Sequence, residues 1–342
     1  MRKAYQKILL VVFVLYSSVY FAQSVSKTGT TAAAFLEIPV GANAIGMGGA
    51  FVSIANDASS LFWNPAGISS HENFEAILNH TNWIANTSFD FAGLVIPLGE
   101  FGNIGFSFTS LSMDDMKVRT VEQPEGTGEY FSAGDISVGI SYARNLTDRF
   151  SIGFTGKYIQ QKIWHMSAYA FAIDAGTKFK TDLFGGMVIG ASIYNFGTSM
   201  QMSGRDSRYF IRVDPNKQGS NDQIPTNIEM NSWDLPLTFQ IGISTNLFNN
   251  QIYRVTVAAD AIHPNNDYES MNFGFETAFK EFLFLRGGYQ SAFNKYSEGG
   301  LSLGFGINSK LILSNALIRF DYAYRDFGRL QSIHSFSVNI IF

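Results

Sequence analysis

The last eight residues of the chain, SFSVNIIF, alternate between polar and apolar side chains as far as Ile340. In a strand the apolar face would carry Phe336, Val338, Ile340 and Phe342, and the polar face Ser335, Ser337 and Asn339. An apolar strand at the edge of a soluble sheet would promote aggregation. A strand sealed into a closed barrel has no free edge, and its apolar face can contact lipid. This segment therefore predicts a membrane β-barrel.

The same two-residue period recurs from about residue 73 onward, for example in residues 135–142, 235–244 and 301–307. A helix, which turns by about 100° per residue, would scatter these side chains around its circumference. We expect about fourteen strands over residues 73–342. Their centres are expected near residues 77, 92, 106, 138, 156, 174, 191, 241, 256, 275, 286, 303, 320 and 337.

The connections between these segments alternate between short and long, as they do in transmembrane barrels. The expected long loops include residues 112–133 and 198–234, and one short link near residues 163–167 departs from the pattern. A soluble β-sandwich or propeller is the alternative, but its strands are usually shorter and its second face would be a packed core. The sequence thus predicts an all-β, antiparallel barrel.

Composition agrees with a sheet that faces lipid. Charged residues make up 15 % of the chain, against roughly 25 % in soluble domains, while Phe (32) and Tyr (15) are abundant. The net charge of −4 argues against nucleic acid as a partner, and the absence of cysteine excludes disulfides and an acylated N-terminal cysteine. A mixed-sign lining of the barrel is expected from Asp90, Asp135, Lys157, Asp174, Lys178, Arg254, Asp260, Glu276, Arg319, Asp321 and Arg325.

The first 22 residues read as a secretory signal peptide. Basic residues precede an apolar run from Ile8 to Tyr16, and a cleavage site is expected after Ala22. A retained membrane helix is the alternative, but the run is about half of the ~20 residues needed to span a bilayer.

Residues 23–72 do not alternate, and they are rich in Ala and Gly with few charges. We expect Asp57 to cap a short helix over Ala58–Trp63, and Asn64-Pro65 to stop it. The glycines of Gly46–Gly49 would let the backbone pass close to a wall. Such a compact segment is a candidate plug inside the barrel. A disordered periplasmic tail is the alternative, and the apolar content argues against it.

Two stretches resemble a known family. TAAAFLEIPVGANAIGMGGAFVSIANDASSLFWNPAGIS, and PEGTG followed by SVGISYARNLTDRFSIGFTGKYIQQ, are similar to the PorV/PorQ family of bacterial outer-membrane proteins, which is related to the FadL long-chain fatty-acid transporters. The resemblance implies a fourteen-stranded barrel with an N-terminal plug. The terminal Phe342 also resembles the C-terminal signature that outer-membrane assembly reads. The expected plug motif comprises Asp57, Trp63, Asn64, Pro65, Ala66 and Gly67.

Signs of catalysis are weak. The five histidines show no paired metal-ligand spacing, and the chain has no Gly-x-Ser-x-Gly elbow and no phosphate loop. An outer-membrane lipase could still hide a Ser–His pair that only the fold brings together. We expect no enzyme activity, no cofactor and no metal site.

Two functions remain open, and both place the protein among outer-membrane lipids. The resemblance implies a type IX secretion component that contacts secretion proteins or holds cargo with a C-terminal signal domain. The alternative is a transporter of small hydrophobic molecules. Because the expected inner faces are polar, they would not stabilise a long apolar solute. This favours the secretion role.

Overall fold

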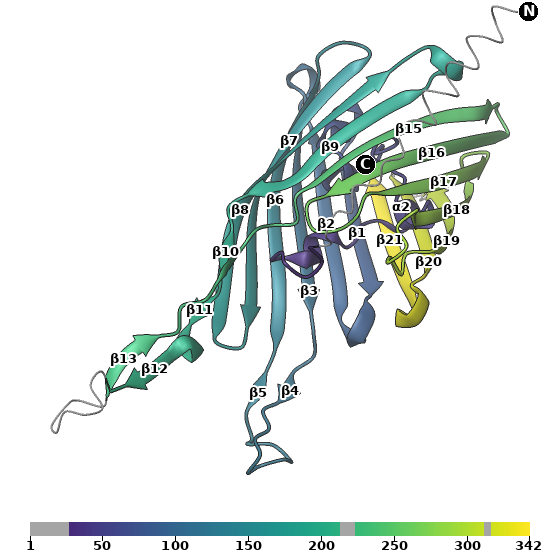
Figure 1. The fold of residues 1–342 in the computed structure, drawn as a ribbon. Helices are drawn as coiled ribbons and strands as arrows, with labels where there is room; N and C mark the ends of the chain where they lie inside the picture. The colour runs from purple at the N-terminus through teal and green to yellow at the C-terminus, as the bar shows by residue number, and fades with distance from the viewer. Residues whose placement is uncertain (1–26, 213–222, 311–315) are drawn as a thin grey trace, which may run out of the picture.

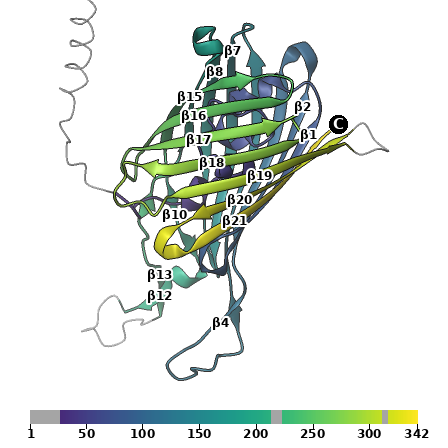
Figure 2. The ribbon, with the colours of Figure 1, turned by 90° about the vertical axis from the view of Figure 1, so that its right-hand side faces the viewer.

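The alternating segments form the wall of a closed barrel. The computed structural model describes residues 27–212, 223–310 and 316–342, so the expected signal peptide at residues 1–22 lies outside the described residues. Within them, fourteen long strands pair in antiparallel order around the barrel (Figures 1 and 2). These strands are β1 (Glu75–Asn82), β2 (Ser88–Pro97), β3 (Asn103–Ser112), β6 (Ala133–Asn145), β7 (Phe150–Ile163), β8 (Met166–Lys180), β9 (Val188–Gly197), β15 (Thr238–Asn249), β16 (Tyr253–Pro264), β17 (Ser270–Phe279), β18 (Leu283–Ala292), β19 (Leu301–Lys310), β20 (Leu317–Asp326) and β21 (Ser332–Ile341).

The first and last strands close the barrel on each other. β1 pairs with β21 from Glu75 opposite Ile341 to Asn82 opposite His334, and the backbone N–H of Phe342 donates to Phe74 O at 3.0 Å. Because every long strand has two neighbours, the wall has no free edge along its length. The expected count of fourteen is confirmed, and each expected centre falls inside one of these strands.

The two ends of the barrel differ in their connections. At one end, here the short-turn end, β2–β3, β6–β7, β8–β9, β15–β16 and β17–β18 are joined by three to seven residues. At the other, the long-loop end, two links extend away from the wall as ribbons (Figures 1 and 2). Their short strands are β4 (Met116–Lys117), β5 (Tyr130–Phe131), β10 (Met200–Gln201), β11 (Ser203–Gly204), β12 (Arg208–Ile211), β13 (Ile224–Asn227) and β14 (Ser232–Trp233). Single turns of 3-10 helix occur at η3 (Ile84–Asn86), η4 (Gly99–Phe101), η5 (Leu183–Gly185), η6 (Arg205–Ser207) and η7 (Gly328–Leu330).

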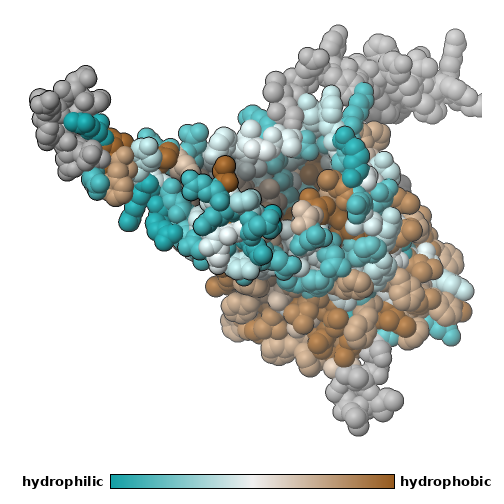
Figure 3. All heavy atoms as spheres, turned by 90° about the horizontal axis from the view of Figure 1, so that it is seen from below, coloured by the Kyte–Doolittle hydropathy of each residue, from teal (hydrophilic) through white to brown (hydrophobic). Residues whose placement is uncertain are grey.

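The outer surface of the wall is apolar, as expected for a lipid-facing barrel. Seen from the long-loop end, hydrophobic residues gather on the outside of the barrel, whereas the projecting ribbon is mostly hydrophilic (Figure 3). Phe336 on the outer face of β21 and Phe342 directly after its end are exposed, while Ser335, Ser337 and Asn339 are buried on the inner face of the strand. The predicted faces of the last strand are therefore confirmed.

The expectation that Asp90 lines the interior is wrong. Its side chain is about half exposed on the outer face of β2, where His80 Nδ1 lies 2.7 Å from Asp90 Oδ1. On this strand Phe89, Phe91 and Val95 face inward instead, and all three are buried. They belong to an apolar cluster with side chains of the N-terminal segment, so the inner face of β2 is the apolar one. Alternation alone does not reveal which face is inside when an apolar segment covers the wall.

The N-terminal segment (residues 27–72) packs against the inner surface of the wall. Its elements are η1 (Ala34–Glu37), α2 (Ala42–Gly46), α3 (Ser60–Trp63) and η2 (Pro65–Ser70). The helix expected over Ala58–Trp63 begins only at Ser60, and its N-cap is Ser59, not the expected Asp57. The Asp57 carboxylate accepts the Ser59 N–H (3.0 Å), and the Ala58 N–H donates to Glu75 Oε1 (3.0 Å) outside the helix. It ends at Trp63, where Asn64-Pro65 was expected to stop it.

Glycine allows one close approach between this segment and the wall. A Cβ atom on Gly46 would lie 2.8 Å from the Cα of Gly304 on β19. Any larger residue at Gly46 would push α2 away from the strands. The expected close passage of the Gly46–Gly49 stretch is confirmed.

Among the described residues, no helix is both long enough and apolar enough to cross a membrane.

Candidate functional site

The Asn64-Pro65 turn is fixed against the wall by hydrogen bonds. The Asn64 amide donates to Val52 O at 2.9 Å and to Thr177 O of β8 at 3.0 Å, and its oxygen accepts the Ala66 N–H at 3.1 Å. The side chain is fully buried, so these bonds satisfy groups that would otherwise destabilise the fold. Asn64 thus links two parts of the N-terminal segment to one barrel strand.

The neighbouring motif residues pack this turn. The Trp63 Nε1–H donates to Val40 O at 2.8 Å, and its ring lies edge-on to Phe51 with centroids 6.2 Å apart. Pro65, Ala66 and Gly67 are all buried, and a Cβ atom on Gly67 would lie 2.3 Å from Ala55 O. Only glycine therefore fits at this last position of the motif.

Asp57 is held by a chain of charges on the wall. Its carboxylate pairs with Arg319 of β20 and accepts a hydrogen bond from Asn43 Nδ2 at 2.6 Å. Arg319 Nε also pairs with Asp321 at 2.9 Å. Burial alone would raise the pKa of Asp57, but Arg319 and the hydrogen bonds from Ser59 bring that pKa below its ordinary value. The carboxylate is therefore charged at neutral pH.

The charge chain continues along the wall to β16. Arg286 Nη1 pairs with Asp321 at 2.6 Å and its Nε with Glu276 at 2.6 Å, and Arg254 Nη1 pairs with Glu276 at 2.9 Å. Alternating signs neutralise each member, which makes such burial tolerable. We call the contact of Asp57 with Arg319 and this chain the clamp.

Two further wall residues hold the backbone of the N-terminal segment. The Asp260 carboxylate accepts the N–H groups of Phe51 at 2.7 Å and Val52 at 2.9 Å. Lys178 Nζ donates to Ile54 O at 2.6 Å and Ala55 O at 2.9 Å. The sequence placed both on an inner face but gave no sign of these partners, because more than 120 residues separate each pair.

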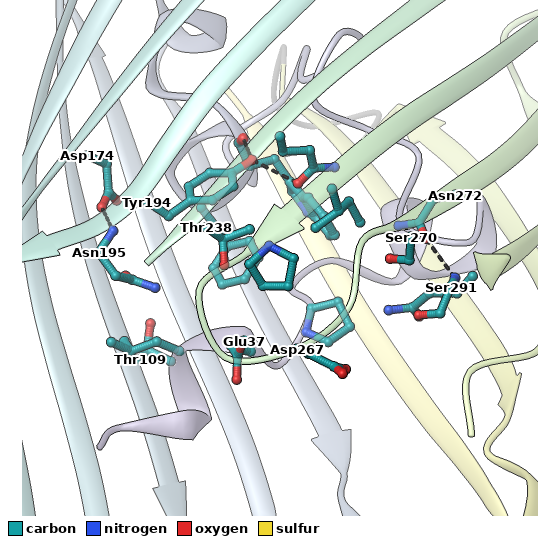
Figure 4. A pocket seen from close by; sticks show the side chains of 18 of the residues that line it. Glu37, Thr109, Asp174, Tyr194, Asn195, Thr238, Asp267, Ser270, Asn272 and Ser291 are labelled. Carbon is teal, nitrogen blue, oxygen red and sulfur yellow. Dashed lines mark hydrogen bonds between the residues drawn. The ribbon is translucent and has the colours of Figure 1, made fainter. Parts of the chain in front are cut away.

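A pocket of about 210 Å³ lies between the N-terminal segment and the wall, toward the long-loop end (Figure 4). We call it the mouth pocket. Phe62, Trp63 and Leu36 line it from the N-terminal segment. The wall and loops contribute aromatic, amide and charged groups, among them Phe91, Lys157, Asp174, Tyr194, Asn195, Tyr268, Asn272 and Asn294.

Charged groups occur on two sides of this pocket. Lys157 Nζ pairs with Asp174 at 2.8 Å and also donates to Asn195. Glu37 and Asp267 lie next to one another on another side (Figure 4). Burial away from water raises the pKa of Glu37 to about 7; the hydrogen bond from Asn266 opposes this rise, and the nearby Asp267 carboxylate adds to it. Sequence reasoning missed Glu37, since an isolated acid in an Ala-rich segment carries no motif.

Among the described residues, no three His, Asp or Glu side chains gather closely enough to coordinate a metal ion. The terminal Phe342 belongs to none of these sites, because its side chain is exposed on the lipid-facing side of the wall.

Comparisons with known proteins agree with this fold. The family model described as "Type IX secretion system protein PorV" matches residues 21–258. The chain belongs to the PorV family. No curated protein sequence matches this PorV-family chain.

Solved structures of hydrocarbon channels have the same fold as this PorV-family barrel. The Pseudomonas putida toluene transporter TodX superposes with a TM-score of 0.52 at 13% identity, covering 88% of this chain and 97% of that one. The Ralstonia pickettii toluene transporter TbuX gives a TM-score of 0.51 at 12% identity with the same coverages, and the CymD monoaromatic hydrocarbon channel gives 0.53 at 12% identity, covering 89% of this chain and 97% of that one. Family and fold together identify a FadL-like barrel of the bacterial outer membrane.

Proposed function

We propose that this protein is a non-enzymatic component of type IX secretion that holds or shuttles secreted cargo at the cell surface. The observation that carries the proposal is the PorV family match over residues 21–258. The two ribbons at the long-loop end support it, because long loops face the cell exterior in outer-membrane barrels. They carry exposed apolar side chains, including Tyr209, Phe210 and Trp233, that a partner protein could cover.

Gene deletion tests this role directly. We expect loss of surface delivery for secreted proteins that carry type IX signal domains, with rescue by the intact gene. A variant in which a short turn replaces residues 205–229 removes the β12–β13 ribbon but leaves the barrel strands in place, so it should assemble and fail to rescue. A matched variant that shortens the loop between β4 and β5, which carries none of the three aromatic side chains named above, controls for trimming a loop. Normal delivery in the deletion strain would refute the proposal.

Transport of a small hydrophobic solute is the second candidate. The inner wall is less polar than the sequence suggested, because β1 and β2 present Ile77, Phe89, Phe91 and Val95 to the interior. The mouth pocket joins this apolar face, and the fold is that of known hydrocarbon transporters. Uptake of a labelled long-chain fatty acid in the deletion strain tests it. Impaired uptake with intact delivery would make transport the primary function.

The domain boundaries belong to the same proposal. Residues 1–22 would be a cleaved signal peptide, residues 23–72 a plug, and residues 73–342 the barrel. The contacts of Asp57, Asn64 and Phe51 with strands on different sides of the wall support the plug. N-terminal sequencing of protein from outer membranes should begin at Gln23, and a start at Met1 would contradict cleavage.

Phe342 is proposed as the residue that outer-membrane assembly reads. Its exposure at the end of β21 leaves it accessible to assembly factors before the barrel closes. Deleting Phe342 should lower the amount of heat-modifiable, folded barrel in the outer membrane. Asn339→Ser, on the inner face of the same strand, serves as the control. Equal assembly of both variants would exclude a special role for the terminal aromatic residue.

A further inference from the structure

The mouth pocket combines an aromatic lining with acidic groups that have no cation. Trp63 and Phe62 approach it from the N-terminal segment, and Phe91, Tyr194 and Tyr268 from the wall and the β16–β17 loop. Aromatic faces attract cations and also accept apolar groups. The pocket is therefore suited to a ligand with both characters.

The single lysine of the pocket is already neutralised. Lys157 pairs with Asp174 at 2.8 Å and donates to Asn195, and Figure 4 shows Asp174 and Asn195 on the side away from Glu37. No Lys, Arg or His within the described part of the chain forms an ion pair with Glu37 or Asp267. The charged side chains of the lining are one lysine (Lys157) and three acids (Asp174, Glu37 and Asp267), so the lining carries an excess of negative charge.

Glu37 makes only long contacts, whereas Asp267 also accepts the Tyr268 N–H at 2.8 Å. Asn266 Nδ2 donates to both oxygens of Glu37 at 3.3 Å, and Asn294 Nδ2 donates to Asp267 at 3.3 Å. Glu37 therefore presents carboxylate oxygens to the pocket that can accept a further donor.

The geometry points to a binding site for a small organic cation, an ammonium or guanidinium group on an apolar body, in the mouth pocket. The charged group would donate to Glu37, and Asp267 would add attraction. The apolar body would lie against Trp63, Phe62 and Phe91, where it is removed from water. An amphiphile with a carboxylate head would meet like charge at the same place.

This inference concerns the pocket alone and holds whether or not the protein acts in secretion. It differs from transport of neutral hydrocarbons, because it requires a positive charge on the ligand. Its failure is also distinguishable from failure of the proposed function, since it is measured on the purified barrel and not in cells.

Calorimetry on the folded, detergent-solubilised barrel tests the site with two matched probes, 2-phenylethylamine and 3-phenylpropionate at pH 8. We expect the amine to bind at least tenfold more tightly than the carboxylate. Glu37→Gln should weaken amine binding at least tenfold and leave the carboxylate no weaker. Glu269→Gln serves as the control, because this exposed acid lies two residues from Asp267 and outside the pocket.

Three results would overturn the inference: no amine binding, equal binding of the two probes, or the same loss in Glu37→Gln and Glu269→Gln. Heat-modifiable gel mobility verifies that each variant is folded. Asp267→Asn gives a second test from the other side of the pocket. It should weaken the amine severalfold, and an unchanged affinity there together with unchanged affinity in Glu37→Gln would exclude the site.

Discussion

The N-terminal segment has an acidic residue near each end of the barrel, and the surroundings of these two residues are opposite. Asp57 is 2 % exposed, pairs with Arg319 and accepts three further hydrogen bonds from Asn43 and Ser59. Glu37 opens onto the mouth pocket, has only long contacts to one amide, and faces another acid. The segment is therefore fixed at the short-turn end and left electrostatically incomplete at the long-loop end.

Removing the clamp cation should have the largest effect. Arg319→Met leaves Asp57 and Asp321 with less compensation for their buried charges, which costs about 3–5 kcal/mol. The chain has no cysteine, so Ala58→Cys is a clean reporter of opening beside Asp57. We expect maleimide labelling of this reporter to accelerate about a hundredfold or more.

The double variant Asp57→Asn/Arg319→Met controls for lost packing, since it removes both charges of the pair. Labelling in the double variant should be slower than in Arg319→Met alone. If both variants label at the wild-type rate, the clamp does not hold the segment and the contrast between the two ends disappears.

Apolar packing should contribute the next largest effect, midway between the two ends. Leu61 is 3 % exposed, and a Cβ atom on Gly105 of β3 would lie 2.2 Å from its Cδ2. Leu61→Ala should cost about 2–5 kcal/mol, since it leaves a cavity against the wall. Labelling should increase at both Ala58→Cys and the mouth reporter Ala33→Cys. An increase at only one reporter would show that the two ends are uncoupled.

Asp260→Asn should have a smaller effect, confined to the part of the N-terminal segment around Phe51 and Val52. The carboxylate accepts two backbone N–H groups and Gln240 Nε2, and an amide oxygen can retain only part of these bonds. We expect a loss of about 1–3 kcal/mol, read as faster labelling of Ser53→Cys. Asp90→Asn is the matched control on the outer face, where its exposed pair contributes about 1 kcal/mol or less. Equal effects of the two variants would mean that Asp260 does not hold the segment.

Asp90 and Asp260 also show how far the sequence could be interpreted. Both occupy polar positions of alternating strands, and alternation correctly located all fourteen strands and most inner faces. It failed at Asp90 because an apolar cluster around Leu61 covers β1 and β2 and reverses the usual polarity of the interior. The Asn64-Pro65 turn could be predicted, since proline restricts the residue before it regardless of tertiary context.

The partners of Asp57, Lys178 and Asp260 could not be predicted in the same way. Each contact joins positions far apart in the chain, and only closure of the barrel brings them together. The mouth pocket depends in addition on where the N-terminal segment packs. The local sequence pattern therefore predicts the strands of the wall well, but it predicts poorly the contacts that the N-terminal segment makes inside the barrel.

The smallest expected effect is a pH dependence of opposite sign at the two ends. The pKa of Glu37 is about 7 in the folded protein against an ordinary 4.5, so the folded state retains a proton that the unfolded segment loses first. The contribution of Glu37 to the stability of the packed segment at the mouth pocket is therefore largest below about pH 4.5, falls as the pH rises to about 7, and is constant above that. Because Glu37 remains exposed to the pocket, solvent screening should limit the change to about 1 kcal/mol. Asp57 has a pKa below its ordinary 3.8, so the clamp weakens only as the pH falls below about 3.8.

Labelling of Ala33→Cys, divided by that of the fully exposed Val121→Cys to remove the intrinsic pH dependence of the thiol, should rise severalfold between pH 5 and pH 8. The same ratio for Ala58→Cys should stay constant over this range, because Asp57 is charged throughout it. Glu37→Gln should abolish the rise at the mouth, since the amide does not titrate. A rise that persists in Glu37→Gln would assign the pH dependence to another group and remove the electrostatic contrast between the two ends.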